Sequence, residues 1–236
     1  MCQSCPPALS RRFMLGALGA ACAMPALRAF AAPAPTAEAP NAIGGDDVLH
    51  RLMAGNARYA ANKIAVRDFS HGRAARSKVQ YPIAAILGCS DSRVAPEFIF
   101  NQGPGELFIV RIAGNVLTEY GVASLEYATA VLGVPLILVL GHSGCGAVSA
   151  AIKSAQDGKP LPGHLPELID RIAPAVTATA SAPAADRLTA AIAENVKLTV
   201  QQTIATAPLL SASVASGKVK VAGGVYDLAT GKVQLL

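Results

Sequence analysis

Two segments that lie far apart in the chain hold the side chains best suited to chemistry. Cys89, Asp91 and Arg93 stand in the first segment, and His142 and Cys145 stand in the second. Each segment directly follows a short run of branched apolar residues, which is the pattern of a strand buried in a parallel sheet. The carboxyl ends of parallel strands share one edge of a sheet, where open α/β folds bind their ligands. The five side chains should therefore meet at one site.

Cys89, His142 and Cys145 form a Cys₂His set, whose thiolate and imidazole donors suit tetrahedral zinc. Three protein ligands leave one position of the metal open, as in catalytic zinc sites, and water bound there has a pKa of about 7. Cys145 is also expected at the start of a helix, whose dipole favours the thiolate. Two other interpretations of the cysteines remain, namely one disulfide or two buried thiols.

Asp91 and Arg93 lie two residues apart, on one side of an extended segment, and can hydrogen-bond each other. A guanidinium partner lowers the pKa of a carboxyl group and fixes its orientation. Such a carboxylate can accept a hydrogen bond from a zinc-bound hydroxide and so orient it. If Arg93 moved away, Asp91 could instead become a fourth ligand and close the site.

The apolar patterns predict the elements that position these residues. Buried strands are expected at Ile83–Leu87, Glu106–Arg111 and Pro135–Leu140, and the segments between them are long enough for helical crossovers. Helices are expected at 46–62, 121–132, 165–172 and 186–205 and from 147 onward, with a loop at 63–81 and breaks at Pro174, Pro183 and Pro208. Segments 218–226 and 232–235 predict a C-terminal hairpin. The fold class is α/β, a mostly parallel central sheet flanked by helices with a C-terminal strand extension.

The N-terminal residues have the pattern of an export leader. Arg11 and Arg12 precede a modest apolar stretch, as in a Tat-type signal peptide, and Ala29-Phe30-Ala31 offers a small-x-small cleavage site. An uncleaved anchor and a lipoprotein site at Cys22 are the less favoured alternatives. The predicted organisation is therefore a signal peptide at 1–31, an Ala/Pro-rich flexible spacer at 32–44 and one domain at 45–236.

Composition argues against a nucleic-acid partner. The formal charge is +5, but Arg11, Arg12 and Arg28 belong to the leader, so the rest of the chain carries only +2. No stripe of Lys and Arg is present, and the chain has no Trp. After leader removal the expected protein binds neither nucleic acid nor membrane, and its location is periplasmic or otherwise exported.

Three motifs together resemble those of the β-class carbonic anhydrases. They are Cys89-Ser90-Asp91-Ser92-Arg93-Val94, Gly114-Asn115 and Gly141-His142-Ser143-Gly144-Cys145-Gly146. The resemblance extends from about residue 46 to the C-terminal hairpin. It implies a lyase that catalyses the zinc-dependent, reversible hydration of carbon dioxide to bicarbonate and a proton through a zinc-bound hydroxide. It also implies one zinc ion per subunit on Cys89, His142 and Cys145, with Asp91 and Arg93 as the catalytic dyad.

The same resemblance implies a substrate pocket at a subunit interface, in a homodimer or homotetramer. By position relative to the motifs, Gln80 corresponds to a substrate-orienting glutamine, while Phe108 and Tyr127 correspond to pocket-lining aromatics. From the residues alone, the two aromatics could equally be core residues of a strand and a helix. Gly144, beside the third ligand, is assigned to substrate binding as well. An inhibitory bicarbonate site that needs Trp is not expected, since the chain has none.

Three rival functions remain to be separated from this one. Gly141-His142-Ser143-Gly144 begins like the nucleophile elbow of an α/β-hydrolase, but Cys145 stands where the pattern needs Gly, and no triad follows. Relatives with the same ligands hydrolyse carbon disulfide or carbonyl sulfide. A structural zinc module would need Asp91 as a permanent fourth ligand.

Overall fold

Hydrogen bonding joins the apolar runs into one five-stranded sheet. The computed structural model describes residues 41–64, 68–70, 72–159 and 161–236. The strand order is β2-β1-β3-β4-β5, and all neighbours are parallel except β4 and β5. The strands are β1 (Ala84–Gly88), β2 (Leu107–Arg111), β3 (Leu136–His142), β4 (Lys220–Tyr226) and β5 (Val233–Leu235). The expected α/β fold with a C-terminal hairpin is confirmed.

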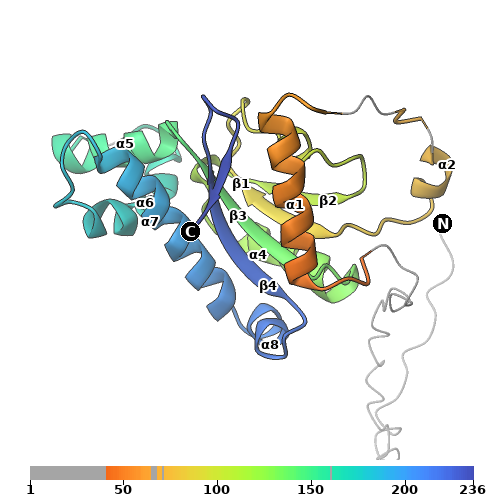
Figure 1. Ribbon diagram of the computed structural model, residues 1–236. Helices are drawn as coiled ribbons and strands as arrows, with labels where there is room; N and C mark the ends of the chain where they lie inside the picture. The colour runs from red at the N-terminus through yellow and green to blue at the C-terminus, as the bar shows by residue number, and fades with distance from the viewer. Residues whose placement is uncertain (1–40, 65–67, 71, 160) are drawn as a thin grey trace, which may run out of the picture. The chain divides into compact units, whose positions relative to one another are not determined.

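Helices cover both faces of the sheet (Figure 1). They are α1 (Gly45–Ala60), α2 (Arg73–Arg76), α3 (Pro96–Ile99), α4 (Glu119–Glu126), α5 (Gly146–Asp157), α6 (Leu165–Ala178), α7 (Arg187–Ala205) and α8 (Leu209–Ala215). A 3₁₀ turn spans Ala113–Asn115, and a π turn, Tyr127–Val131, continues α4. Helix α1 packs on one face with α3, while α4, α7 and α8 pack on the other.

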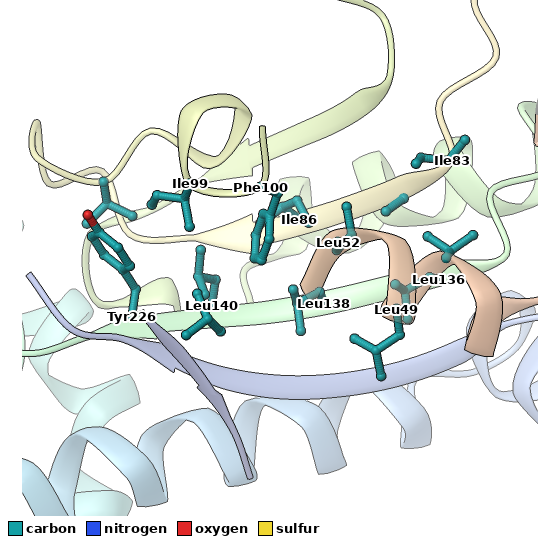
Figure 2. Packing of buried hydrophobic residues seen from close by; sticks show 14 residues of the cluster. Leu49, Leu52, Ile83, Ile86, Ile99, Phe100, Leu136, Leu138, Leu140 and Tyr226 are labelled. Carbon is teal, nitrogen blue, oxygen red and sulfur yellow. The ribbon is translucent and has the colours of Figure 1, made fainter. Parts of the chain in front are cut away.

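Alternate residues of the central strands point toward opposite faces of the sheet. In β3, Leu138 and Leu140 point toward α1, where they join Leu49 and Leu52 of that helix and Phe100, as Figure 2 shows. The intervening β3 side chains contact α4 and α7 on the opposite face. Every residue of β1 and β3 is buried. Strands buried on both faces are continuously apolar, which is why the sequence shows unbroken runs there rather than alternation.

A third apolar cluster lies beyond the carboxyl ends of β1 and β3. It joins Cys89 and Cys145 to apolar residues of α5, α6 and α7, among them Val148 and Ile172. The two thiols therefore lie against a packed core rather than on a flexible loop. This cluster positions the residues that carry the chemistry.

The expected break at Pro174 is wrong, because α6 continues through this residue to Ala178. Its apolar residues Ile169, Ile172 and Val176 are buried on one face, and this packing outweighs the hydrogen bond that a proline lacks. The breaks at Pro183 and Pro208 are confirmed, since both residues lie between helices.

Two short helices differ from the expected pattern. Helix α8 was not predicted, and α2 lies inside the segment 63–81 that was expected to be a loop. The leader and most of the expected spacer lie outside the described residues. At the end of that spacer, Asn41 is buried, and its Nδ2 donates to the carbonyl oxygen of Leu132. Within the described part of the chain, no helix is both long and apolar enough to cross a membrane.

Candidate active site

The carboxyl ends of β1 and β3 bring together the three residues expected to bind metal. One ligand atom each from Cys89, His142 and Cys145 lies within 4.8 Å of the other two, and all three residues are buried. Tetrahedral zinc with bonds of about 2.0–2.3 Å holds its ligand atoms about 3.3–3.8 Å apart, which is compatible with this limit. Neither cysteine forms a disulfide. The arrangement therefore fits a Cys₂His metal site and excludes the disulfide interpretation.

The surroundings of His142 also indicate a metal. Its Nδ1 lies 3.0 Å from the carbonyl oxygen of Ser143, and a carbonyl only accepts, so Nδ1 carries the proton. The other ring nitrogen, Nε2, is buried and has no hydrogen-bond partner among the described residues. A buried acceptor without a partner is costly, and coordination to a metal satisfies it.

A hydrogen bond between Cys145 and Cys89 moves the pKa values of the two thiols in opposite directions. A hydrogen bond from Cys145 is the main reason that the pKa of Cys89 falls to about 4. The same bond and burial raise the pKa of Cys145 above its usual range. Burial lowers the pKa of His142, but the nearby Cys89 thiolate outweighs this effect, so the pKa of His142 is raised. One thiolate is therefore already present at neutral pH.

Asp91 and Arg93 form the expected pair beside the ligands. Arg93 Nε donates to Asp91 Oδ1 at 2.9 Å, and Arg93 Nη2 donates to Oδ2 at 2.7 Å. The backbone N–H of Arg93 also donates to Oδ1. The side-chain bonds from Arg93 hold the pKa of Asp91 well below its usual range. Asp91 Oδ2 lies 3.9 Å from His142 Nε2, so an ionised, fixed carboxylate faces the position of the metal.

Sequence reasoning missed several groups that hold the site. Arg111, at the end of β2, donates through Nε to the carbonyl oxygen of Cys89 and through Nη2 to that of Asp91. The backbone N–H of Gly114 donates to Cys89 Sγ at 3.2 Å. Asn195 of α7 donates to the carbonyl oxygen of Gly114. The Gly114-Asn115 motif marked this turn, but no spacing rule connects Arg111 or Asn195 to the metal ligands.

Three of the four expected substrate-binding residues lie away from the metal ligands. Gln80 and Tyr127 line a groove of about 1070 Å³, whose other walls come from 68–69, 75–81, 103–106 and 131–132. Phe108 contacts Tyr127, with ring centroids 6.2 Å apart. The wall segments 75–81, 103–106 and 131–132 precede β1, β2 and β3, so the groove is at the amino end of the sheet. Of the expected substrate-binding set, only Gly144 lies beside the metal ligands, with its φ at +66° and open space where a Cβ would stand.

Five residues of β1 span about 16 Å at the rise of an extended strand. Gln80 precedes this strand and Cys89 follows it. The two ends of the sheet therefore separate Gln80 from the metal ligands of its own chain. Tyr127 likewise precedes β3, whereas His142 ends it.

Fold and site together define an α/β metalloenzyme, with three ligands for an ion that takes four and a carboxylate facing that ion. The model of the carbonic anhydrase family matches residues 84–233. A carbonic anhydrase of Mycolicibacterium smegmatis is 37% identical over 185 residues, which cover 78% of this chain and 89% of that protein. Carbonic anhydrase 2 of Mycobacterium tuberculosis is 38% identical over 185 residues, which cover 78% and 86%.

Solved structures show the same architecture. A β-carbonic anhydrase of Coccomyxa, in complex with acetazolamide, is 27% identical and covers 81% of this chain and 82% of its own, with a TM-score of 0.62. Tetrameric β-carbonic anhydrases of Sordaria macrospora share the fold at 23% identity and a TM-score of 0.64, over 80% of this chain and 97% of theirs. The chain belongs to the β-class carbonic anhydrase family. It is a zinc-dependent lyase that hydrates carbon dioxide reversibly.

Proposed function

We propose that this carbonic anhydrase holds its catalytic zinc on Cys89, His142 and Cys145 and uses Asp91 and Arg93 as its catalytic dyad. The observation that carries the assignment is the buried cluster of three ligand atoms, in which His142 Nε2 lacks any other described partner. When bound, zinc acts as a Lewis acid that brings the pKa of a water molecule to about 7. This chemistry supplies the nucleophile that carbon dioxide needs.

The protein residues orient that reaction. Asp91 stays ionised, so it can accept a hydrogen bond from the nucleophile but cannot donate one back. Arg93 engages both carboxylate oxygens and thereby fixes the direction of this acceptor. Cys89 and Cys145 lie in an apolar cluster with Val116 and Ile172, which restricts water around the site. After hydration, bicarbonate leaves, and the released proton passes to solvent or buffer.

Zinc content and hydration activity of the wild type and of Asp91→Asn test the dyad. The isosteric change keeps the volume but removes the charge, so Asp91→Asn should retain zinc and lose activity about 100-fold or more. Asp46→Asn is the matched control, because Asp46 is also paired with a cation, Lys220, but lies on α1 away from the site. Full activity of Asp91→Asn would remove Asp91 from the mechanism, and a wild type without zinc would refute the metal assignment.

We propose further that a homodimer, alone or within a tetramer, completes the substrate pocket. Gln80, Phe108 and Tyr127 cannot reach the metal of their own chain, because they lie at the amino end of the sheet. A second copy can present the same residues to the carboxyl end. Its Gln80 would then orient carbon dioxide, and its two aromatic residues and the chain's own Gly144 would form the adjoining walls.

The leader supports an exported location. We propose that residues 1–31 direct Tat export to the periplasm and are removed to leave Ala32 as the N-terminus. Replacing both Arg11 and Arg12 by Lys should retain the precursor in the cytoplasm, and mass spectrometry of the exported wild type should find Ala32 first. An exported protein that keeps Met1 would support an anchor instead, and lipid on Cys22 would support a lipoprotein.

A further inference from the structure

A polar side chain of α7 is linked to the first metal ligand through a single glycine. Asn195 is buried, and its Nδ2 donates to the carbonyl oxygen of Gly114 at 2.8 Å. The N–H of the same glycine donates to Cys89 Sγ at 3.2 Å. Asn195 follows Gly114 by 81 residues and belongs to none of the motifs. Two hydrogen bonds thus connect a distant helix to the sulfur of Cys89.

The glycine lies in a turn that needs outside support. Asn115 N donates to the carbonyl oxygen of Ile112 at 2.8 Å, and the φ angles of Gly114 and Asn115 are +71° and +46°. Two consecutive left-handed residues are unfavourable when one carries a side chain, so surrounding contacts must hold them. The side-chain nitrogen of Asn115, Nδ2, gives no such support, since it is buried without a partner among the described residues.

The turn also has no room to adjust around a larger residue. A Cβ on Gly114 would lie 2.7 Å from Ile172 Cδ1 and 3.3 Å from the Cβ of Ala147. The backbone at this position is therefore confined by α6 and α5, while Asn195 of α7 fixes its carbonyl. The Gly114 turn is thus contacted by three helices, and one of them bonds its carbonyl oxygen.

The position of Asn195 is itself fixed by its neighbour in sequence. Val196 packs directly on the sheet, where a Cβ on Gly141 of β3 would lie 2.6 Å from its Cγ2. A Cβ on Gly223 of β4 would lie 2.8 Å from its Cγ1. Because Gly141 and Gly223 have no side chains, α7 can pack close to the sheet. This packing fixes the distance of α7 from the sheet and places the Asn195 amide against the Gly114 turn.

We propose that Asn195 is a positioning residue for the metal site. By holding the Gly114 carbonyl, it keeps the Gly114 N–H directed at Cys89 Sγ, which orients this sulfur and withdraws part of its negative charge. Partners of this kind outside the ligand shell typically change metal affinity 10- to 100-fold. The inference rests on the proposed role of Cys89 as a zinc ligand and adds a residue that tunes this ligand.

The test compares two Asn195 variants with a matched control. Asn195→Leu keeps the approximate volume without a donor, and Asn195→Ser is a smaller polar alternative, too short to reach Gly114, for use if the first variant folds poorly. Asn41→Leu is the control, because Asn41 is also buried and also donates one bond to a distant backbone carbonyl, that of Leu132. Leu132 precedes β3, so this bond lies at the amino end of the sheet.

Zinc affinity is measured by chelator competition on the metal-free full chain, and the Cys–Co²⁺ charge-transfer absorption is recorded after cobalt loading. Both Asn195 variants should bind zinc at least about 10-fold more weakly and shift the charge-transfer band. Asn41→Leu should lower the melting temperature but keep the wild-type affinity and spectrum. Wild-type affinity and spectrum in a folded Asn195 variant would overturn the inference.

The outcome for the Cys89→Ser variant separates this inference from the metal assignment. If Cys89→Ser binds zinc and cobalt as the wild type does, the proposed ligand set fails, whatever the Asn195 variants show. If Cys89→Ser loses the charge-transfer band or weakens binding while the Asn195 variants match the wild type, only the positioning role of Asn195 fails. An equal loss of affinity in Asn41→Leu would likewise count against it, since general destabilisation would then explain the effect.

Discussion

At the scale of single residues, the Asp91–Arg93 pair orients the Asp91 carboxylate more than it stabilises the folded protein. The side chain of Arg93 is 59% exposed and that of Asp91 is 16% exposed. An ion pair with one partner so exposed contributes little to folding, because water screens it. Two parallel N–H···O bonds nevertheless give the carboxylate a defined direction. The pair therefore lets an exposed arginine fix the direction of a carboxylate that faces the buried cluster of Cys89, His142 and Cys145.

The opposite pKa shifts of the two thiols predict how zinc binding depends on pH. Ligands bind zinc only after deprotonation. Before zinc binds, the pKa of Cys89 is lowered to about 4, whereas those of Cys145 and His142 are raised. At pH 7, Cys89 is thus already a thiolate, while Cys145 still holds its proton. Zinc binding should release at least one proton, and affinity should rise with pH across the neutral range.

Calorimetric zinc titrations in buffers with different ionisation enthalpies measure this release directly. The observed heat should vary linearly with the ionisation enthalpy, with a slope of at least about one proton per zinc at pH 7. The Cys145→Ser variant provides the blank, because it lacks a metal ligand and should give no zinc-binding heat in any buffer. A wild-type heat that is the same in every buffer would contradict the predicted protonation of the metal-free site.

At the scale of elements, the approach of α7 to the sheet links packing to the site. Gly141 of β3 immediately precedes His142, and Val196 of α7 occupies the space above it. Asn195, the neighbour of Val196, bonds to Gly114. A single helix thus contacts the chain next to one metal ligand and supports the hydrogen bond to another. Distortion of this contact should affect both stability and metal binding.

Gly141→Ala should destabilise the fold by about 1–3 kcal/mol, because its Cβ would overlap Val196. Val196→Ala removes the overlapping methyl groups, so the double variant should be more stable than the sum of the two single effects predicts. Urea unfolding of the four proteins gives this coupling. Gly146→Ala is the control, since nothing lies within 4 Å of its Cβ position. Strict additivity of the two substitutions would show that α7 does not pack as described.

The sequence predicted the elements whose patterns are local and continuous. The three parallel strands were placed correctly, because a continuous apolar run can be recognised without its distant partners. The prediction that all three are buried is confirmed for β1 and β3 but wrong for the edge strand β2, of which only Val110 is buried. Pro174 was assigned to a helix break because local propensity disfavours it there, but the buried face of α6 outweighs this cost. The helix continues because of tertiary packing, which cannot be recognised from the sequence of one segment.

The part of the site that was missed depends on contacts across the fold. Asn195 has the sequence pattern of an ordinary polar helix residue, yet the structure buries it against Gly114. Arg111 ends a strand and turns back to the Cys89 loop, which no spacing rule indicates. Motif residues could be identified because their types and spacing are distinctive. Their supporting partners could not, because a single Asn or Arg is chemically unremarkable until its neighbours are known.

At the scale of the whole molecule, the sheet separates the two halves of the expected site. Metal ligands lie at its carboxyl end, and Gln80 and Tyr127 lie at its amino end. Tyr127 is 47% exposed and Tyr120 is 85% exposed, although both are large aromatic residues. Exposed apolar groups of this kind often mark contacts between subunits. Two copies related by a two-fold axis would give two identical pockets, each with residues from both subunits.

Mixing two inactive variants tests this arrangement. Gln80→Leu should lose most activity with zinc retained, and Cys145→Ser should lose activity together with zinc. In a mixed dimer, one pocket combines the intact metal site of the first subunit with the intact Gln80 of the second. Unfolding and refolding the two variants together at equal amounts should therefore restore about one quarter of the wild-type activity, since half of the dimers are mixed and each has one complete pocket.

A mixture of Cys145→Ser with Asp91→Asn is the matched control for this experiment. Asp91 lies 3.9 Å from His142 within one chain, so it and the metal ligands belong to the same subunit's half of the pocket. Mixed dimers of these two variants contain no complete pocket and should stay inactive. If the control mixture recovers as much activity as the first, or if Gln80→Leu is fully active alone, the shared pocket is refuted. Recovery confined to the Gln80→Leu mixture would place the substrate-orienting glutamine on the opposite subunit from the zinc that it serves.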